Sequence, residues 1–180
     1  MNDVRPIFLV GFMACGKSTV GGLLADALGW TFRDTDELVE QRERRSIAEI
    51  FRAEGEERFR AIEWSVLRSL AGLRRAVVAC GGGLFLGHDR RRWLWRNGST
   101  VWLDLPLAAV RARLAGSGPE VPRRPLWSAP DPLSQRALYE KRRATYALAD
   151  LRVDASAEDP AVVARSVQRE LGRHGSRFSC

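Results

Sequence analysis

The stretch that most constrains the fold is Gly11-Phe12-Met13-Ala14-Cys15-Gly16-Lys17-Ser18, which fits the phosphate-binding loop pattern G-x-x-x-x-G-K-[ST]. It follows Ile7–Val10, a short apolar run typical of a buried strand. It precedes residues 19–28, whose apolar side chains recur at helical spacing. A strand, a glycine-rich loop and a helix N-terminus aim several backbone N–H groups at one point, where the helix dipole also favours negative charge. This context disfavours the alternative, a chance match in a glycine-bearing turn.

The pattern assigns roles to single residues. Lys17 is expected to reach the β- and γ-phosphates of a nucleotide, and the Ser18 hydroxyl to ligate Mg²⁺. The rest of the predicted nucleotide-binding loop consists of Gly11, Ala14, Cys15, Gly16 and Thr19. The sequence therefore predicts a site for a nucleoside triphosphate and its metal ion.

Composition narrows the class of protein. A length of 180 residues predicts a single domain over residues 1–180. No stretch approaches the roughly 20 apolar residues of a membrane span, and the first residues do not resemble a signal peptide. The three cysteines, Cys15, Cys80 and Cys180, are too few and too scattered for a disulfide framework or a zinc site. We therefore expect a cytoplasmic protein that has no membrane partner.

The net charge of +7 raises the question of a nucleic-acid partner. The basic residues are almost all arginines spread over many predicted helices, and Lys17 and Lys141 are the only lysines. Neither a nucleic-acid-binding motif nor a basic run with interleaved aromatic residues is found. We therefore expect small-molecule partners, no nucleic acid, and a monomer.

Predicted strands and helices alternate along the chain, which indicates a parallel sheet covered on both faces. The sequence thus predicts a three-layer α/β/α fold with a central, mainly five-stranded parallel sheet. The predicted strands are 7–10, 30–34, 76–80, 100–104 and 151–154. The predicted helices are 19–28, 56–73, 88–97, 106–114, 134–148 and 160–171, with a further short helix that begins at the capping-box pattern of residues 46–49. Residues 116–132 contain five prolines and two glycines, so we expect no single regular element there.

The second candidate site is Asp34-Thr35-Asp36, at the end of the second predicted strand. Ligands of parallel α/β sheets bind at the carboxyl ends of strands, so these acids should face the same crevice as the phosphate loop. A spacing of two allows both side chains to lie on one side of an extended segment. Phosphoryl transfer uses one acid near Mg²⁺ and another to orient or deprotonate the acceptor hydroxyl. Because such a pair is also common in caps and turns, the phosphate loop one helix earlier gives it its functional interpretation.

Three further groups are candidates. Gly81-Gly82-Gly83 follows a predicted strand, and such runs are tolerated where backbone closely approaches a ligand or takes a positive φ. Arg124 lies in the proline-rich segment, which we predict to be a mobile lid at about residues 116–132; the alternative is an exposed loop arginine. Arg60 and Arg142 lie on predicted helices, where the alternative for each is a surface charge.

As a set, these features resemble the shikimate kinases, small phosphate-loop kinases related in fold to nucleoside monophosphate kinases. The resemblance runs from Ile7 to about Leu171. It is carried, in family order after the phosphate loop, by Asp34-Thr35-Asp36, Gly55-Glu56-Glu57-Arg58-Phe59-Arg60 with Glu63, Gly81-Gly82-Gly83, Arg124-Pro125-Leu126, and Lys141-Arg142 before Tyr146.

The resemblance implies transfer of a phosphoryl group from ATP to the 3-hydroxyl of shikimate with Mg²⁺ as cofactor, in aromatic amino acid biosynthesis. It implies that Lys17 contacts the phosphates and that Ser18 and Asp34 hold the metal, Asp34 through water. Asp36 would bind and activate the acceptor hydroxyl. Arg124 would complete the catalytic set by reaching the transferred phosphoryl group.

The resemblance also implies contacts at both ends of the site. Arg60 and Arg142, with Gly81, Gly82 and Gly83, would hold the carboxylate and hydroxyls of shikimate. A bidentate guanidinium suits a carboxylate, which gives the two arginines a chemical reason. Arg113 would stack on adenine, and Arg124 would also contact ATP.

Two other kinds of protein remain as alternatives. A kinase of the same fold that acts on another polyol acid, such as gluconate, would need Asp36 and the phosphate loop but not Arg60, the triple glycine and Arg142 together. A non-catalytic regulatory relative would be favoured by loss of Lys17, Asp34 or Asp36, and all three are present.

The chain departs from the family pattern at a few points. The segment between Arg113 and Arg124 looks longer than in familiar bacterial members, and Glu158 stands where some members carry a basic residue near adenine. Cys15 is either a small residue that fits the loop or, as a thiol at a helix N-terminus, redox-sensitive. Residues 172–180 match nothing and are expected to be a disordered tail.

Overall fold

The computed structural model describes residues 5–116 and 131–174. Its centre is an all-parallel sheet with the order β2-β3-β1-β4-β5. The strands are β1 (Ile7–Val10), β2 (Thr31–Asp34), β3 (Ala76–Ala79), β4 (Ser99–Asp104) and β5 (Leu151–Asp154). The predicted five-stranded parallel sheet is confirmed.

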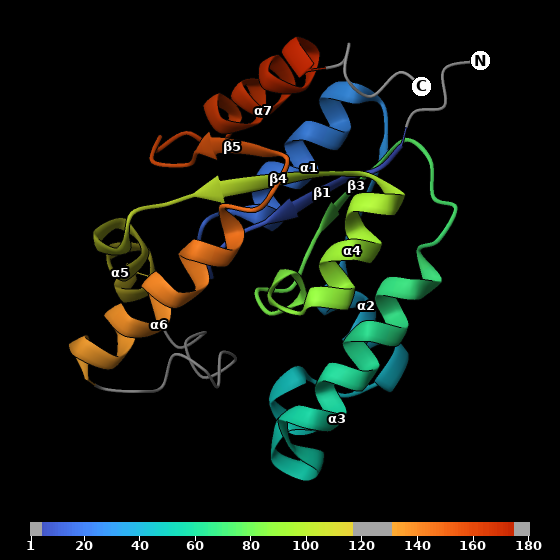
Figure 1. Ribbon diagram of the computed structural model, residues 1–180, viewed down its shortest axis with the longest axis vertical. Helices are drawn as coiled ribbons and strands as arrows, with labels where there is room; N and C mark the ends of the chain where they lie inside the picture. The colour runs from blue at the N-terminus through green and yellow to red at the C-terminus, as the bar shows by residue number, and fades with distance from the viewer. Residues whose placement is uncertain (1–4, 117–130, 175–180) are drawn as a thin grey trace.

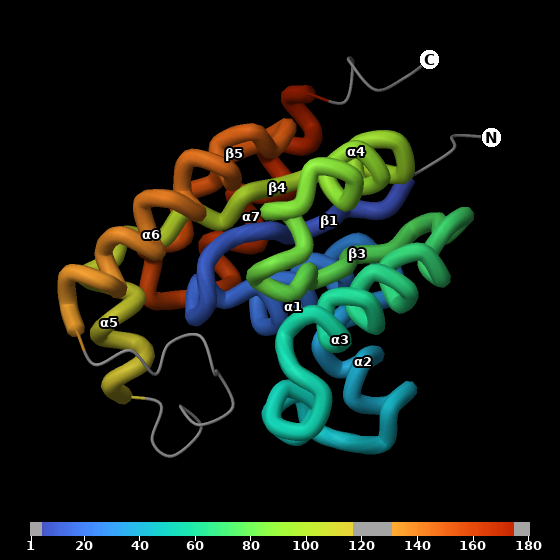
Figure 2. Tube along the Cα trace, turned by 60° about the horizontal axis from the view of Figure 1, so that its bottom comes forward, coloured from blue at the N-terminus to red at the C-terminus, as the bar shows by residue number. Residues whose placement is uncertain are grey.

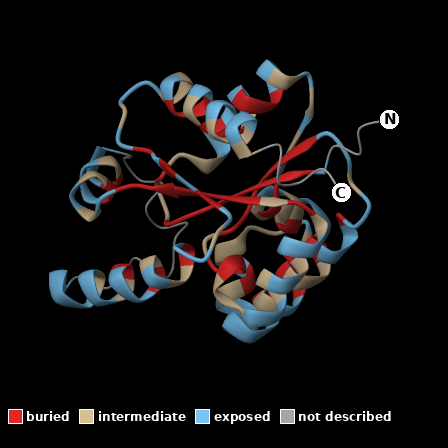
Figure 3. Ribbon diagram, turned by 45° about the horizontal axis from the view of Figure 1, so that its top comes forward, coloured by how far each residue is buried: buried red, intermediate tan, exposed pale blue. Residues whose placement is uncertain are grey.

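Helices cover both faces of this sheet (Figures 1 and 3). The helices are α1 (Lys17–Leu28), α2 (Thr35–Glu43), α3 (Ile47–Ser69), α4 (His88–Asn97), α5 (Leu107–Gly116), α6 (Pro132–Tyr146) and α7 (Pro160–His174), with a 3₁₀ turn η1 at Leu84–Leu86. Helices α1 and α7 pack against each other, while α4 and α6 both contact η1. The inner strands β1, β3 and β4 are buried almost throughout, and the centre of the sheet is red in Figure 3, because both of its faces are covered, as an all-parallel sheet requires.

The main core is built from the inner strands. All four residues of β1 and all four of β3 are buried, which explains why both strands read as continuous apolar runs. A second, smaller apolar cluster lies between α2 and α3, which lie together at one side of the molecule in Figure 2. Its buried members are Val39, Ile50, Phe59, Ile62 and Val66. This cluster holds α3 against α2.

Helix α3 consists of two helical parts that meet at a kink. Ser46 forms the predicted capping box with Glu49, and the short helix expected after it is the first part of α3. At Gly55 the backbone takes a φ of 79°, a conformation that glycine adopts without strain, and the helix kinks there. The expected second helix, 56–73, is therefore the later part of α3, and it ends four residues early.

Other boundaries also differ from the sequence-based expectation. Helix α1 begins at Lys17, directly after Gly16. Helix α2 was not expected, because only Thr35 and Val39 are buried on it and its hydrophobic pattern is weak. The two ends of the predicted irregular segment 116–132 are helical, since Gly116 closes α5 and Pro132 opens α6, and residues 117–130 lie outside the described residues. The predicted disordered tail was wrong at its start, because α7 extends to His174.

Among the described residues, no helix is long and apolar enough to cross a membrane.

Candidate active site

A cavity of about 740 Å³ opens at the carboxyl ends of the strands. Its walls come from the loop after β1, the ends of β2 and β3, the helices α3 and α6, and the loop after β5. The residues predicted for the site that line it are Ala14, Cys15, Gly16, Lys17, Ser18, Thr19, Asp34, Asp36, Arg60, Gly82, Gly83, Arg113 and Arg142. The fold thus brings both the nucleotide-binding and the acceptor-binding candidates to one space.

The phosphate loop closes tightly on itself. Gly11 has a φ of 147°, and a Cβ placed there would lie 2.7 Å from the carbonyl oxygen of Leu103, so glycine is required. The Nζ of Lys17 donates to the carbonyl oxygens of Gly11 at 3.1 Å and Phe12 at 3.0 Å. Cys15 is only 1% exposed, which favours the interpretation that it is a small residue that fits the loop.

Ser18 and Asp34 form the candidate metal site. The Ser18 hydroxyl donates to Oδ2 of Asp34 at 2.5 Å, at the wall of the cavity. Among the described residues, no three acids, cysteines or histidines cluster to hold a metal by themselves. Mg²⁺ prefers oxygen ligands and takes most of them from water and substrate phosphates, with one or two from the protein. The pair of oxygens therefore fits Mg²⁺ bound together with a nucleotide.

The expectation that Asp34 and Asp36 share one extended segment is wrong. Asp34 ends β2 and caps α2, because its Oδ1 accepts a hydrogen bond from the backbone N–H of Asp36 at 2.9 Å. Asp36 is thus already in the first turn of α2. Both carboxyl groups nevertheless reach the same cavity.

Asp36 is placed among other carboxyl groups. Burial, followed by the charges of Asp34 and Glu63, raises the pKa of Asp36 to about 7, although Lys17 and Arg60 act in the opposite direction. Burial also raises the pKa of Glu63. A carboxyl group with a pKa near neutrality is well matched to accepting a proton from a hydroxyl during a reaction.

Gly81 lies between these two acids. A Cβ added at this residue would overlap Oδ1 of Asp36 and lie 2.8 Å from Oε1 of Glu63. Its backbone N–H donates to Oγ1 of Thr35 at 2.7 Å, which ties the turn after β3 to α2. Glycine at this point therefore lets two carboxyl groups approach the backbone from the same side.

The other two glycines of the run meet the acceptor-side arginine and α6. The guanidinium of Arg60 occupies the space that a Cβ of Gly83 would take, with Cζ at 2.5 Å. The Gly82 carbonyl accepts a hydrogen bond from the Tyr146 hydroxyl at 2.5 Å. The run is thus fixed by α3 on one side and α6 on the other.

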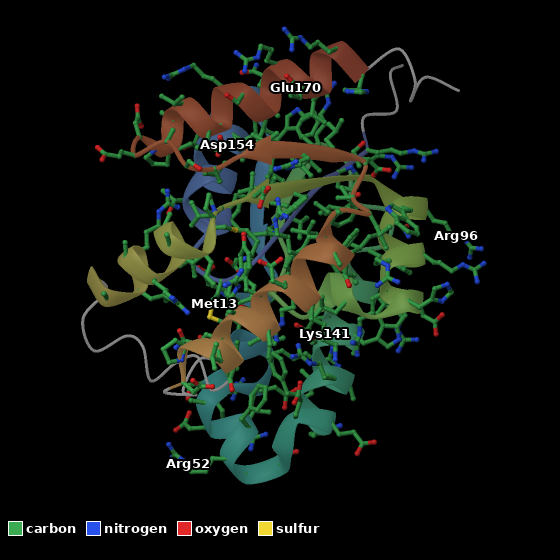
Figure 4. The ribbon with its side chains drawn as sticks, turned by 60° about the vertical axis from the view of Figure 1, so that its left-hand side comes forward. Met13, Arg52, Arg96, Lys141, Asp154 and Glu170 are labelled. Carbon is green, nitrogen blue, oxygen red and sulfur yellow. The ribbon has the colours of Figure 1, made fainter. Side chains whose placement is uncertain are left out.

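Arg60 and Arg142 are both drawn into the cavity. Arg60 donates to Glu63 at 2.9 Å and to Glu56 at 3.1 Å. Arg142 is buried, with its Cζ 5.6 Å from the centre of the Phe12 ring, whereas Lys141 beside it is exposed on α6, where Figure 4 labels it. Arg142 is therefore not a surface charge, whereas Arg60 lines the cavity and also pairs with two acids of its own helix, as the alternative expected.

Arg113 and the loop after β5 form another part of the cavity wall. The cavity is lined there by Ala155, Ala157 and Glu158 of the loop and by Pro160, the first residue of α7. Arg113 donates to the carbonyl oxygens of Ala14, Ala155 and Ala157 at 3.2, 3.0 and 3.3 Å. Arg124 and most of the predicted lid lie outside the described residues.

The sequence-based site omitted several residues. Glu63 and Tyr146 were part of the resemblance without an assigned role, and Thr35 was passed over between its two acidic neighbours. Ile47 and Phe51 add an apolar wall to the cavity. The sequence analysis gave these two residues no role, because a pattern of apolar residues does not separate a core face from a ligand-facing one.

These features define a class of protein. A phosphate loop, an adjacent serine–aspartate oxygen pair, a buried acid and two arginines around one cavity are the parts of a phosphate-loop kinase for a small, anionic acceptor.

Comparison with known proteins gives the family. The family model described as "Shikimate kinase" matches residues 13–172. The chain is 44% identical over 163 residues to a shikimate kinase of Synechococcus elongatus, which covers 89% of this chain and 83% of that protein. A shikimate kinase from Acinetobacter baumannii, solved in complex with shikimate, superposes with a TM-score of 0.85 at 30% identity, covering 98% of this chain and 96% of the other. The chain belongs to the shikimate kinase family.

The gluconate alternative is matched more weakly. A gluconokinase from Sinorhizobium meliloti 1021 gives a TM-score of 0.61 at 18% identity, over 99% of this chain and 97% of that one. That likeness shows a common fold alone. The family match therefore favours shikimate kinase over a kinase of another polyol acid.

Proposed function

We propose that this chain transfers the γ-phosphoryl group of ATP to the 3-hydroxyl of shikimate, giving shikimate 3-phosphate and ADP. The observation that carries the proposal is the position of Asp36 in a cavity that also holds the phosphate loop and two arginines, Arg60 and Arg142. An acceptor whose carboxylate binds the arginines can present a hydroxyl to Asp36 beside the phosphate loop. The product would feed chorismate and aromatic amino acid biosynthesis.

On the nucleotide side, the backbone N–H groups of the phosphate loop would hold the phosphates, and Lys17 would turn from the loop carbonyls to the β- and γ-phosphates. Ser18 and Asp34 would hold Mg²⁺, which when bound neutralises phosphate charge. Arg113 would contact adenine. Arg124 is assigned to the transferred phosphoryl group by resemblance, since it lies outside the described residues.

On the acceptor side, Asp36 would accept the proton of the attacking hydroxyl. Its raised pKa, about 7, leaves a fraction of the carboxyl ionised at neutral pH and makes it a stronger proton acceptor than an ordinary aspartate. Arg60, Arg142 and the backbone of Gly81, Gly82 and Gly83 would orient the acceptor. Orienting the reacting groups can lower a barrier by roughly 7–11 kcal/mol, which is more than a positioned proton acceptor typically contributes.

The experiment is to identify the product. The purified protein is incubated with ATP, Mg²⁺ and shikimate, and the phosphorylated product is examined by ³¹P–¹H correlation NMR. Coupling of the phosphorus to the proton on carbon 3 supports the proposal, whereas phosphate on another hydroxyl or none contradicts it.

The expected cytoplasmic location, the monomeric state and the absence of a nucleic-acid partner stay predictions.

A further inference from the structure

One side chain connects the phosphate loop to the far end of the cavity. Arg113, on α5, donates through Nη1 to the carbonyl oxygen of Ala14 at 3.2 Å. Through Nη2 it donates to the carbonyl oxygens of Ala155 at 3.0 Å and Ala157 at 3.3 Å. The planar fork of an arginine can hold several acceptors in fixed directions, which a single ammonium group cannot. Three backbone carbonyls from two loops are therefore held by one half-buried guanidinium.

The backbone at Ala14 is of a kind that needs support. Three residues of the loop have a positive φ: Gly11, Gly16 and Ala14, the last at 59°. Glycine adopts such angles freely, but a residue with a Cβ is disfavoured there and persists only when its surroundings hold it. The same Nη1 of Arg113 lies 3.7 Å from the place a Cβ would take at Gly16, so the guanidinium lies along the loop at both positions.

We propose that Arg113 is a positioning residue for the phosphate loop, holding Ala14 in its left-handed conformation so that the cradle for the triphosphate is formed before nucleotide arrives. The inference rests on the proposed function, since it assigns this loop to the triphosphate of ATP. It differs from a contact with adenine, because Arg113 here acts through the backbone of the loop. A preformed site binds more tightly because less ordering is left to be done on binding.

A ligand that lacks adenine distinguishes support of the phosphate loop from a contact with adenine. Inorganic triphosphate with Mg²⁺ occupies the cradle but has no adenine to stack. We therefore propose calorimetric titration of triphosphate into the wild type, Arg113→Ala, Ala14→Gly and the double variant. Loss of a hydrogen bond from a charged donor should weaken triphosphate binding about tenfold in Arg113→Ala.

The coupling between the two residues is the sharper readout. Glycine at position 14 takes a positive φ without help, so Ala14→Gly should recover most of the affinity lost in the Arg113→Ala background. In the wild-type background the same change should not strengthen triphosphate binding in this way, because Arg113 already holds the loop there. An arginine that merely supports the fold predicts no such recovery. Recovery in the double variant also covers the case in which Arg113→Ala alone is too unstable to titrate.

Two further variants serve as controls. Arg113→Lys keeps the charge but loses the fork, and should bind triphosphate as weakly as Arg113→Ala. Arg111→Ala removes an exposed arginine of the same helix whose Nη2 donates to the Pro132 carbonyl at 2.9 Å, away from the loop, and should bind as the wild type does.

The outcomes divide clearly. If Arg113→Ala weakens ATP binding but leaves triphosphate binding unchanged, Arg113 acts at the base and the inference is wrong. The inference is also wrong if Arg113→Lys binds triphosphate as tightly as the wild type does. It is wrong as well if Arg113→Ala loses the same triphosphate affinity whether residue 14 is alanine or glycine. If the wild type binds neither triphosphate nor ATP, both the inference and the proposed function fail. If the wild type binds ATP normally but the effects of Arg113→Ala and Ala14→Gly on triphosphate affinity are independent, only the inference fails.

Discussion

Arg60 and Glu63 form an ion pair inside the acceptor end of the cavity, with Nη1 of Arg60 2.9 Å from Oε2 of Glu63, which is 1% exposed. The other oxygen of Glu63, Oε1, is buried and has no hydrogen-bond partner among the described residues. A second acid, Glu56, holds the same guanidinium at 3.1 Å but is half exposed. The orientation of Arg60 therefore depends on one buried and one solvated carboxylate.

This pair gives a first prediction. Glu63→Gln removes the buried charge that faces Arg60, and we expect the KM for shikimate to rise about tenfold with little change in the KM for ATP. Glu56→Gln is the matched control, because it touches the same guanidinium from an exposed position, where an ion pair is worth ~0–1 kcal/mol. Steady-state kinetics in both substrates checks this, and equal effects of the two variants would contradict it.

Gly81 gives a second prediction. In Gly81→Ala the new methyl group must displace the carboxyl groups of Asp36 and Glu63, so we expect kcat to fall at least about a hundredfold while the protein stays folded. Gly22→Ala, on α1, is the control, since nothing lies within 4 Å of its Cβ position. Turnover assays and far-UV circular dichroism of both variants measure the effect. Near-normal turnover in Gly81→Ala would show that the two carboxyl groups need not approach this backbone.

Asp36 gives a third prediction, for activity. Asparagine cannot accept the proton of the attacking hydroxyl, so Asp36→Asn should lose nearly all turnover and keep its affinity for ATP, which we propose to bind at the phosphate loop. Turnover and nucleotide titration are the measurements. A variant that retains substantial kcat would remove Asp36 from its role as proton acceptor.

The same variant carries a fourth prediction, for stability. The folded-state pKa of Asp36, about 7, lies above the ordinary value of 3.8, so the folded protein binds this proton more tightly than the unfolded chain does. The resulting stabilisation is complete below about pH 4 and is lost as the pH rises through 7. Without metal or nucleotide, Asp36→Asn should therefore exceed the wild type in unfolding free energy at pH 8, on the order of a few kcal/mol. The difference should shrink toward pH 4 in denaturant titrations; a constant difference would contradict the raised pKa.

Arg142 gives a fifth prediction. Arg142→Ala should raise the KM for shikimate strongly, by a free-energy equivalent of about 2–5 kcal/mol, because it removes a buried partner of the acceptor carboxylate. Lys141→Ala is the matched control, since Lys141 is next to it on α6 but exposed. Equal losses for shikimate and ATP in Arg142→Ala would show that Arg142 supports the fold or the nucleotide instead.

Much of the fold followed from the sequence because the signals are local. The buried strands β1 and β3 are continuous apolar runs, and the capping box of α3 involves only Ser46 and Glu49. The two parts of α3 on either side of Gly55 were predicted as separate helices, whereas α2 was missed because it buries little. An element of this kind is decided by tertiary packing, which local periodicity does not record.

The site was predicted as a set of residues but not as a geometry. Sequence spacing and family resemblance selected Arg60 and Arg142, yet only the fold shows that both line the cavity. The three carbonyl contacts of Arg113 join residues far apart in the chain, and no sequence pattern encodes them. The left-handed backbone of Ala14 was likewise not predictable, since glycine is the residue expected at such an angle.

The most direct test of the account is the choice of acceptor. ADP release is measured with Mg²⁺ and ATP at varied concentrations of shikimate and, separately, of gluconate, using the wild type and the Asp36→Asn variant as a blank. The account predicts that kcat/KM for shikimate exceeds that for gluconate by at least about a thousandfold, because the arginine pair and the triple glycine fit one acceptor and leave another imperfectly paired. Comparable values for the two acids, or ADP release that shikimate does not stimulate, would contradict it.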